Sequence, residues 1–127
     1  MSDFSHRVNA EKNEQFAESL DGSQAVERGW IVTVRFYSLL HYVEERLTSH
    51  GYTSERHNQR MDNIKSCNAV ETAVYKKYRA LYDISRDARY ECVRMNQEDV
   101  EESERILDEG KRMLGFDQGG SDYKYEV

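Results

Sequence analysis

The sequence contains no proline and only two cysteines in 127 residues. Proline interrupts helices, because its ring clashes with the preceding turn and it lacks a backbone N–H. Its absence, together with frequent Glu, Arg, Leu and Ala, favours a helical chain. Cys67 and Cys92 form neither a CxxC pair nor a disulfide framework. We therefore expect free thiols and a reducing, cytoplasmic location.

Long apolar runs are also missing. No run approaches the ~20 apolar residues that a membrane-spanning helix needs, and no signal peptide opens the chain. We therefore expect no association with a membrane. A chain of 127 residues is long enough for one domain, and a domain of this size buries about two-thirds of its extended surface.

Several chemical motifs are missing as well. Gly119-Gly120 stands alone, so there is no glycine-rich loop for phosphates. The histidines form no HxxxH pair and do not join the cysteines at metal-ligand spacing, and no ExxH motif supports a di-iron bundle. No nucleophile elbow indicates a serine hydrolase. The sequence therefore predicts no metal and no cofactor.

The net charge of −6 is unevenly distributed. Residues 55–94 contain nine Lys/Arg and six Asp/Glu, a net charge of +3, so the rest of the chain carries −9. An acidic protein is a poor non-specific binder of nucleic acid, because phosphate contacts dominate that affinity. Two interpretations of the basic segment stay open: a local patch for a nucleotide or short single strand, and a solvated helix face.

Apolar residues recur at helical spacing in five segments, which predicts an all-α, up-and-down bundle of four to five helices. We expect helices over residues 5–20, 24–49, 54–66, 69–90 and 97–114. Residues 1–115 should form one domain, followed by a flexible tail over 116–127. The helix of residues 24–49 is the longest and most apolar, so it should be central. Along it, Trp30, Val34, Tyr37 and His41 recur as an apolar stripe.

Capping signals predict several helix ends. Ser23 is a plausible N-cap for residues 24–49, and Asn68 followed by Glu71 suggests a capping box before residues 69–90. Asn96 opens the last helix, whose acidic first turn suits the positive end of the helix dipole. Gly115 should stop that helix.

Polar residues on the helix of residues 24–49 form a first candidate group: Arg35, His41, Glu44 and Glu45. Arg35 and His41 fit the spacing R-x5-H. Six residues turn through about 240°, so the two side chains do not share a helix face. A histidine on an apolar stripe is either a hydrogen-bonded core or interface residue, or a catalyst.

The second group opens the helix of residues 54–66. His57 and Arg60 are neighbours on one helix face, and Arg56 lies beside them. Such a pair can serve a phosphate, because arginine binds its oxygens in a fork and histidine titrates near neutrality. An ordinary solvated first turn explains the same residues.

The third group lies near the end of residues 69–90. Arg86, Arg89 and Tyr90 occupy adjacent helix positions. Asp83 and Asp87 lie among these arginines, and Asp83 can pair with Arg86 at i+3. The group predicts either a clamp for an anionic ligand or a salt-bridged helix end that packs on the helix of residues 24–49.

The order of these elements resembles the HEPN superfamily (higher eukaryotes and prokaryotes nucleotide-binding), in particular its small stand-alone prokaryotic members. The resemblance covers roughly residues 5–114. It is carried by a pattern FYxxLHxxE, a histidine in the next connection, and a later Leu/Arg/Tyr segment. The matching residues are Phe36, Tyr37, Leu40, His41 and Glu44; His57; and Leu81, Arg86 and Tyr90.

The resemblance implies a helical bundle that forms a two-fold dimer in toxin–antitoxin, phage-defence or RNA-processing systems, frequently beside a small nucleotidyltransferase. Many members are metal-independent ribonucleases in which an arginine holds the scissile phosphate and a histidine assists proton transfer at the ribose 2′-OH. Their R-x4–6-H signature lies on a late helix. Here no Arg-Asn dipeptide is present and no histidine follows His57, so the late helices lack that signature.

We therefore predict a non-catalytic, homodimeric HEPN-type binding or assembly module whose partner is a nucleotide, RNA, or a protein such as a nucleotidyltransferase. The expected ligand-binding residues are Arg56, His57, Arg60, Arg86, Arg89 and Tyr90. The alternative is a metal-independent ribonuclease with a composite His/Arg site at the dimer interface. Its catalytic candidates are His41, His57 and Arg86. A purely structural partner, or a phage or plasmid accessory protein, is a third possibility.

Overall fold

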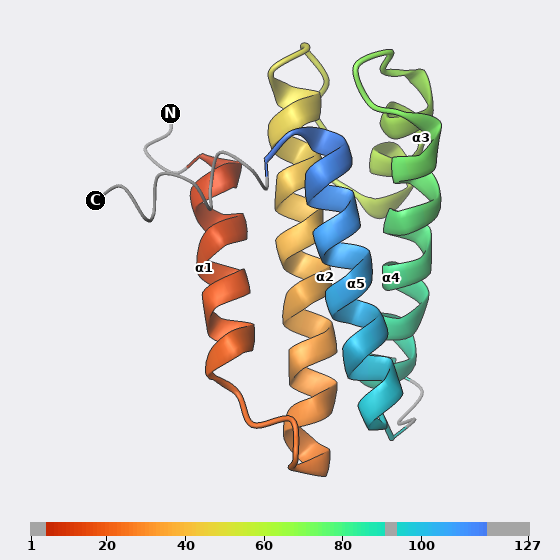
Figure 1. Ribbon diagram of the computed structural model, residues 1–127. Helices are drawn as coiled ribbons and strands as arrows, with labels where there is room; N and C mark the ends of the chain where they lie inside the picture. The colour runs from red at the N-terminus through yellow and green to blue at the C-terminus, as the bar shows by residue number, and fades with distance from the viewer. Residues whose placement is uncertain (1–4, 91–93, 117–127) are drawn as a thin grey trace, which may run out of the picture.

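The computed structural model describes residues 5–90 and 94–116. These residues form five helices and no strand, which confirms the all-α prediction (Figure 1). The helices are α1 (His6–Ser19), α2 (Ala25–Thr48), α3 (His57–Ser66), α4 (Thr72–Tyr90) and α5 (Gln97–Leu114). Within the described ranges, none of these helices combines the length and the hydropathy needed to cross a bilayer.

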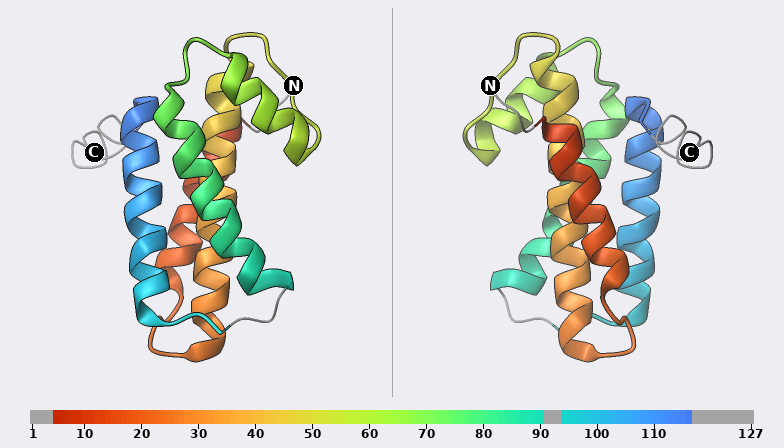
Figure 2. Two further views of the ribbon diagram at one scale, coloured as in Figure 1. Left: turned by 90° about the vertical axis from the view of Figure 1, so that its right-hand side faces the viewer. Right: turned by 90° about the vertical axis from the view of Figure 1, so that its left-hand side faces the viewer.

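Helix α2 is central, as predicted. It contacts all four other helices: α1, α4 and α5 run alongside it, and the short α3 lies across its C-terminal end (Figure 2). The larger apolar cluster lies between α2, α4 and α5 and includes the fully buried Leu39, Leu81 and Leu107. A smaller cluster at the other end of the bundle contains Ile31 and Val100. Most residues of α2 between Ile31 and Leu47 are buried.

Helix α5 begins and ends where the sequence predicts. Asn96 accepts a hydrogen bond from Asp99 N at 2.8 Å, and Asp99 accepts one from Asn96 N at 2.9 Å, which completes a capping box. The helix stops at Gly115, whose φ of 85° is a left-handed conformation that glycine adopts without strain. The capping box and Gly115 act through bonds within a few residues, so they set the ends of α5 independently of its packing against other helices.

Three other predicted helix starts are wrong. Ser23 does not cap α2, because its N and Oγ both donate to Asp21 Oδ1, at 2.9 and 2.7 Å; Gln24 occupies the N-cap. Helix α4 begins at Thr72, so Asn68 does not cap it; the chain before it turns instead, with Val70 N bonded to the Cys67 carbonyl. Helix α3 begins at His57, three residues later than expected.

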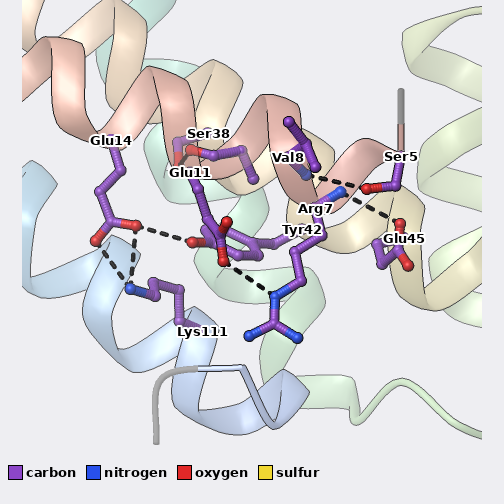
Figure 3. Close-up of polar contacts among 10 residues, drawn as sticks. Ser5, Arg7, Val8, Glu11, Glu14, Ser38, Tyr42, Glu45 and Lys111 are labelled. Carbon is purple, nitrogen blue, oxygen red and sulfur yellow. Dashed lines mark hydrogen bonds and ion pairs between the residues drawn. The ribbon is translucent and has the colours of Figure 1, made fainter. Parts of the chain in front are cut away.

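Helix α1 is attached to the bundle largely by polar contacts, because its buried side chains are only the small Ala10 and Ala17. Glu14 accepts hydrogen bonds from Tyr42 Oη of α2, at 2.9 Å, and from Lys111 Nζ of α5, at 2.8 Å (Figure 3). Ser38 Oγ of α2 donates to the Ala10 carbonyl at 2.8 Å. These bonds join α1 to two neighbouring helices where large apolar contacts are few.

Phe116, the first residue of the predicted tail, packs against Tyr42 at a ring-centroid distance of 5.2 Å. The guanidinium groups of Arg7 and Arg46 lie over the Phe116 ring, at 5.3 and 5.6 Å from its centroid. The remainder of the predicted tail, residues 117–127, lies outside the described residues.

Helix α5 packs tightly against Leu39 of α2 at Gly110. A Cβ at this position would lie 2.8 Å from Leu39 Cδ1, which is closer than real contacts allow, and Leu39 is fully buried. Gly29 on α2 offers a matched comparison, because a Cβ there would meet only Ala88 at an ordinary 4.0 Å.

Gly29→Ala should therefore raise the free energy of unfolding by about 0.5–1 kcal/mol through helix propensity. Gly110→Ala should lose that gain and lower the free energy by about 1–2 kcal/mol through overpacking. Urea unfolding of both variants measures the difference. Equal stability of the two variants would contradict this account of Gly110.

Candidate functional site

The apolar stripe of α2 does not face the core along its whole length. Val34 is buried, but Trp30 is 58% exposed, Tyr37 is 38% exposed, and Val26, on the same side, is 76% exposed. Two members of the apolar stripe, Trp30 and Tyr37, are therefore exposed. The reason lies in how the other helices are arranged around α2.

Each neighbouring helix takes one side of α2. Arg35 faces α5, Ser38 faces α1, and Phe36 faces α4, where its ring lies 5.5 Å from that of Tyr78. Within residues 5–90 and 94–116, no other helix covers the remaining side, between α1 and α4, over residues 26–37. We call this side the open face and define it by Val26, Trp30, Thr33 and Tyr37.

The open face is part of a longer seam on α2. Spacings of four and three residues alternate along it, as at the a and d positions of a helix that packs against another helix. The seam consists of Val26, Trp30, Thr33, Tyr37, Leu40 and Glu44. Helix α3 covers its C-terminal end at Glu44, whereas Val26 and Trp30 at its N-terminal end are exposed.

The covered end contains the second predicted group. Arg60 of α3 forms an ion pair with Glu44, which is buried, and Arg60 Nη1 donates to Tyr78 Oη at 3.3 Å. His57 Nδ1 lies 3.3 Å from the same hydroxyl, and the His57 ring stacks on Tyr82 at 3.8 Å. His57 and Arg60 therefore meet at one phenol, and together they fasten α3 to α2 and α4.

Electrostatics in this cluster favour a neutral imidazole. Burial, followed by the positive charge of Arg60, lowers the pKa of His57. Burial raises the pKa of Tyr78 and keeps its phenol protonated. Burial opposes the charge of Arg60, but Tyr78 and Glu44 outweigh it and raise the pKa of the guanidinium. The charged groups at the centre of the cluster are thus the paired Arg60 and Glu44.

The third predicted group separates into two parts. Arg89 Nη1 donates to Tyr37 Oη and Tyr90 Oη, both at 3.3 Å, and its Nε donates to the Ser85 carbonyl. The guanidinium also lies over the rings of Phe36, Tyr37 and Tyr90. Arg86 is exposed. The structure thus brings Arg89 and Tyr90 together but directs the guanidinium of Arg89 into internal contacts.

Two further expectations concern neighbouring charges. Asp83 pairs with Arg79, at 3.5 Å, rather than with Arg86, so the predicted i+3 pair is wrong. Arg56 is the exposed N-cap residue of α3, adjacent to His57. Arg56 and Arg86 are therefore the two exposed arginines among the predicted ligand-binding residues.

A row of aromatic rings connects the two groups. The Phe36 ring lies 5.6 Å from the Tyr82 ring beneath His57, and 5.4 Å from the Tyr37 ring beside Arg89. The rings therefore connect His57 of α3 with Arg89 of α4 along the α4 side of the open face.

His41 lies on the α1 side of the seam and contacts another histidine. Its Nδ1 is 3.0 Å from His6 Nδ1 of α1, so one ring donates and the other accepts. Burial, followed by His6 and Arg60, lowers the pKa of His41 to about 4. Arg35 instead bonds to Val100 and Ser103 of α5. The R-x5-H residues therefore reach different helices, as their angular separation predicts.

Two features of this region were not predicted from the sequence. His6 is the contact of His41, and no local pattern indicated it. The exposure of Val26 and Trp30 was also missed, although the regular four-three spacing of the seam was a signal for helix packing. In the described part of the chain, no group of three or more His, Cys, Asp or Glu could hold a metal ion.

No protein-family model matches this chain, and no curated protein matches it.

The Glu44–Arg60 pair supports a prediction about stability. Arg60→Ala leaves the buried Glu44 without a partner and should lower the free energy of unfolding by about 3–5 kcal/mol. Replacing both residues by Met should recover most of this loss, because no buried charge remains. Arg79→Ala, which breaks an exposed pair, is the control and should have little effect. A loss for Arg60→Ala no larger than the control would contradict the role of the pair.

The low pKa of His41 predicts a pH dependence. Its pKa is about 4 in the fold and near 6.5 in the unfolded chain. As the pH falls from about 6.5 to about 4, His41 is protonated in the unfolded chain before it is protonated in the fold. The free energy of unfolding therefore decreases over this pH range.

His41→Gln removes this titration. The difference in free energy of unfolding between wild type and variant should change by on the order of 2–3 kcal/mol across this window and stay constant below it. Urea unfolding at a series of pH values measures the difference, and the carboxylates common to both proteins cancel. A difference that does not change with pH would refute the assignment.

Proposed function

We propose that this chain is a non-catalytic binding and assembly module of the HEPN type, which works as a homodimer in a toxin–antitoxin, phage-defence or RNA-related system. The observation that carries the proposal is the open face of α2. Large apolar side chains that gather on one exposed face are typical of a protein-interaction site. Trp30 and Val26 provide the most exposed part of this face.

The neighbouring helices extend the apolar surface. Tyr90 at the end of α4 is exposed and lies beside Tyr37 through their shared partner Arg89. On α1, Phe16 is also exposed. Glu14 reaches α5 from one flank of α1, and Phe16 lies on the opposite flank, which borders the open face. An aromatic residue therefore stands on each side of the seam.

The hydrogen bonds that Arg60 and Arg89 form within the protein favour a protein partner over a polyanion. Phosphate binding requires arginine N–H groups that point to solvent. Arg60 donates to Glu44 and Tyr78, and Arg89 donates to Ser85, Tyr37 and Tyr90. Of the predicted phosphate-binding arginines, Arg56 and Arg86 remain exposed. The net charge of −6 also opposes non-specific binding of nucleic acid.

The ribonuclease remains the alternative proposal, and one observation favours it: His57 and Arg60 converge on Tyr78 Oη. The same contacts weaken it, because Glu44 neutralises Arg60 and the Nδ1 of His57 is engaged with Tyr78. Metal-independent RNA cleavage that is abolished by His57→Ala would favour this alternative over the binding module.

Substitution of the open face should prevent dimerisation. We expect wild type to show a monomer–dimer equilibrium in sedimentation velocity, and Trp30→Glu to remain monomeric, because dimer formation would bury the new carboxylate without a partner. Val8→Glu is the matched control: it puts the same charge on another exposed apolar residue, 38% exposed, on the side of α1 away from α2. Circular dichroism checks that both variants stay folded.

Two outcomes would overturn the proposal. One is a wild-type protein that stays monomeric up to several hundred micromolar. The other is a Trp30→Glu variant that dimerises as well as Val8→Glu, because the interface would then lie elsewhere.

A further inference from the structure

We infer that the occupant of the open face is a second copy of this chain, and that the two copies pair through an antiparallel contact between their α2 helices. This inference rests on the proposed homodimer and adds its geometry. It follows from the spacing of the seam, the sizes of its side chains and the position of α3.

The seam has the same spacing in both directions. Val26, Trp30, Thr33 and Tyr37 are separated by four, three and four residues, so an antiparallel copy can occupy the same register. Trp30 then faces the partner's Thr33, and Tyr37 faces the partner's Val26. A two-fold axis relates the two halves, as closed dimers require.

The sizes of these side chains match across the antiparallel pair. In each facing pair, a large aromatic residue, Trp30 or Tyr37, meets a smaller branched residue of the other copy. Large and small residues that alternate in this way fill the space between facing helix positions. Thr33 is 6% exposed and lies between the larger Trp30 and Tyr37, so it forms the floor on which the partner's Trp30 rests. A parallel pair would place two indoles against each other in one layer and leave two threonines facing in the next.

The position of α3 also selects the antiparallel arrangement. In both views of Figure 2, α3 projects to one side at the C-terminal end of α2, where it covers the seam at Glu44. In a parallel pair, the two α3 helices would compete for the same end of the seam. In the antiparallel pair they lie at opposite ends, and the partner's Ala25, the first residue of its α2, falls at the level of Ser38. The partner helix therefore starts where α3 begins to cover the seam.

The size of the contact predicts a weak dimer. The open face spans twelve residues, about 18 Å of helix, and a width of about two helices, roughly 20 Å. Each copy would then bury roughly 350 Å², or about 700 Å² in total, which is below the 1,200–2,000 Å² of stable interfaces. We therefore expect a dimer that dissociates on dilution.

Cysteine cross-linking tests the pairing. Val26→Cys and Tyr37→Cys are prepared separately in a Cys92→Ser background, with the buried Cys67 retained. Each protein alone, and an equal mixture of the two, is treated with a short bismaleimide at a concentration where wild type sediments as a dimer. The antiparallel pairing predicts a linked dimer in the mixture and little linkage of either variant alone. Val8→Cys in the same background is the control and should remain unlinked.

The results separate this inference from the proposed function. Linkage of Val26→Cys with itself, without a gain in the mixture, would show parallel pairing and overturn the inference while leaving the homodimer in place. Dimers that sediment normally but link in neither arrangement would also overturn it. A wild-type protein that remains monomeric would remove the proposed homodimer and this geometry together. Addition of Trp30→Glu to both cysteine variants should abolish the linkage in the mixture.

Discussion

The arrangement of this protein depends on the ion pair between Glu44 and Arg60. A buried carboxylate is costly unless a cation and hydrogen-bond donors compensate it, so Glu44 requires Arg60 to lie over the end of α2. Arg60 and His57 also meet at Tyr78, which ties α3 to α4 at the same point. The short α3 is thereby held on the C-terminal end of the seam. Its ten residues are too few to cover the rest.

This constraint connects the fold to the proposed function. Because α3 covers the seam only near Glu44, the large side chains at Trp30 and Tyr37 remain exposed between α1 and α4. The residues that suggested phosphate chemistry take part in holding the bundle together: Arg60 neutralises Glu44, and Arg89 fastens the end of α4 to Tyr37. The same polar contacts that stabilise the fold thus reduce the support for catalysis and direct attention to the apolar face.

The accuracy of the sequence-based expectations followed the range of the interactions involved. The limits of α5 were predicted because Asn96, Asp99 and Gly115 act through bonds within a few residues. Ser23 and Asn68 carry similar signals but do not cap helices, because Asp21 takes the Ser23 donors and the chain near Asn68 turns before α4 begins. A capping residue thus predicts a helix start only where no other nearby group forms a hydrogen bond with it and the chain does not turn first.

The sequence by itself determined the helical content, the central place of α2, and the separation of Arg35 from His41, because helical period and local propensity set all three. It also brought His57 and Arg60 onto one face of α3. Only the tertiary structure decided which part of the α2 seam is buried, which histidine His41 meets, and that Arg89 bonds to Tyr37 of α2. These three features depend on which helix, distant in sequence, packs against a given turn of α2 or α4. Periodicity shows that a helix face is apolar, but it does not show which element covers that face.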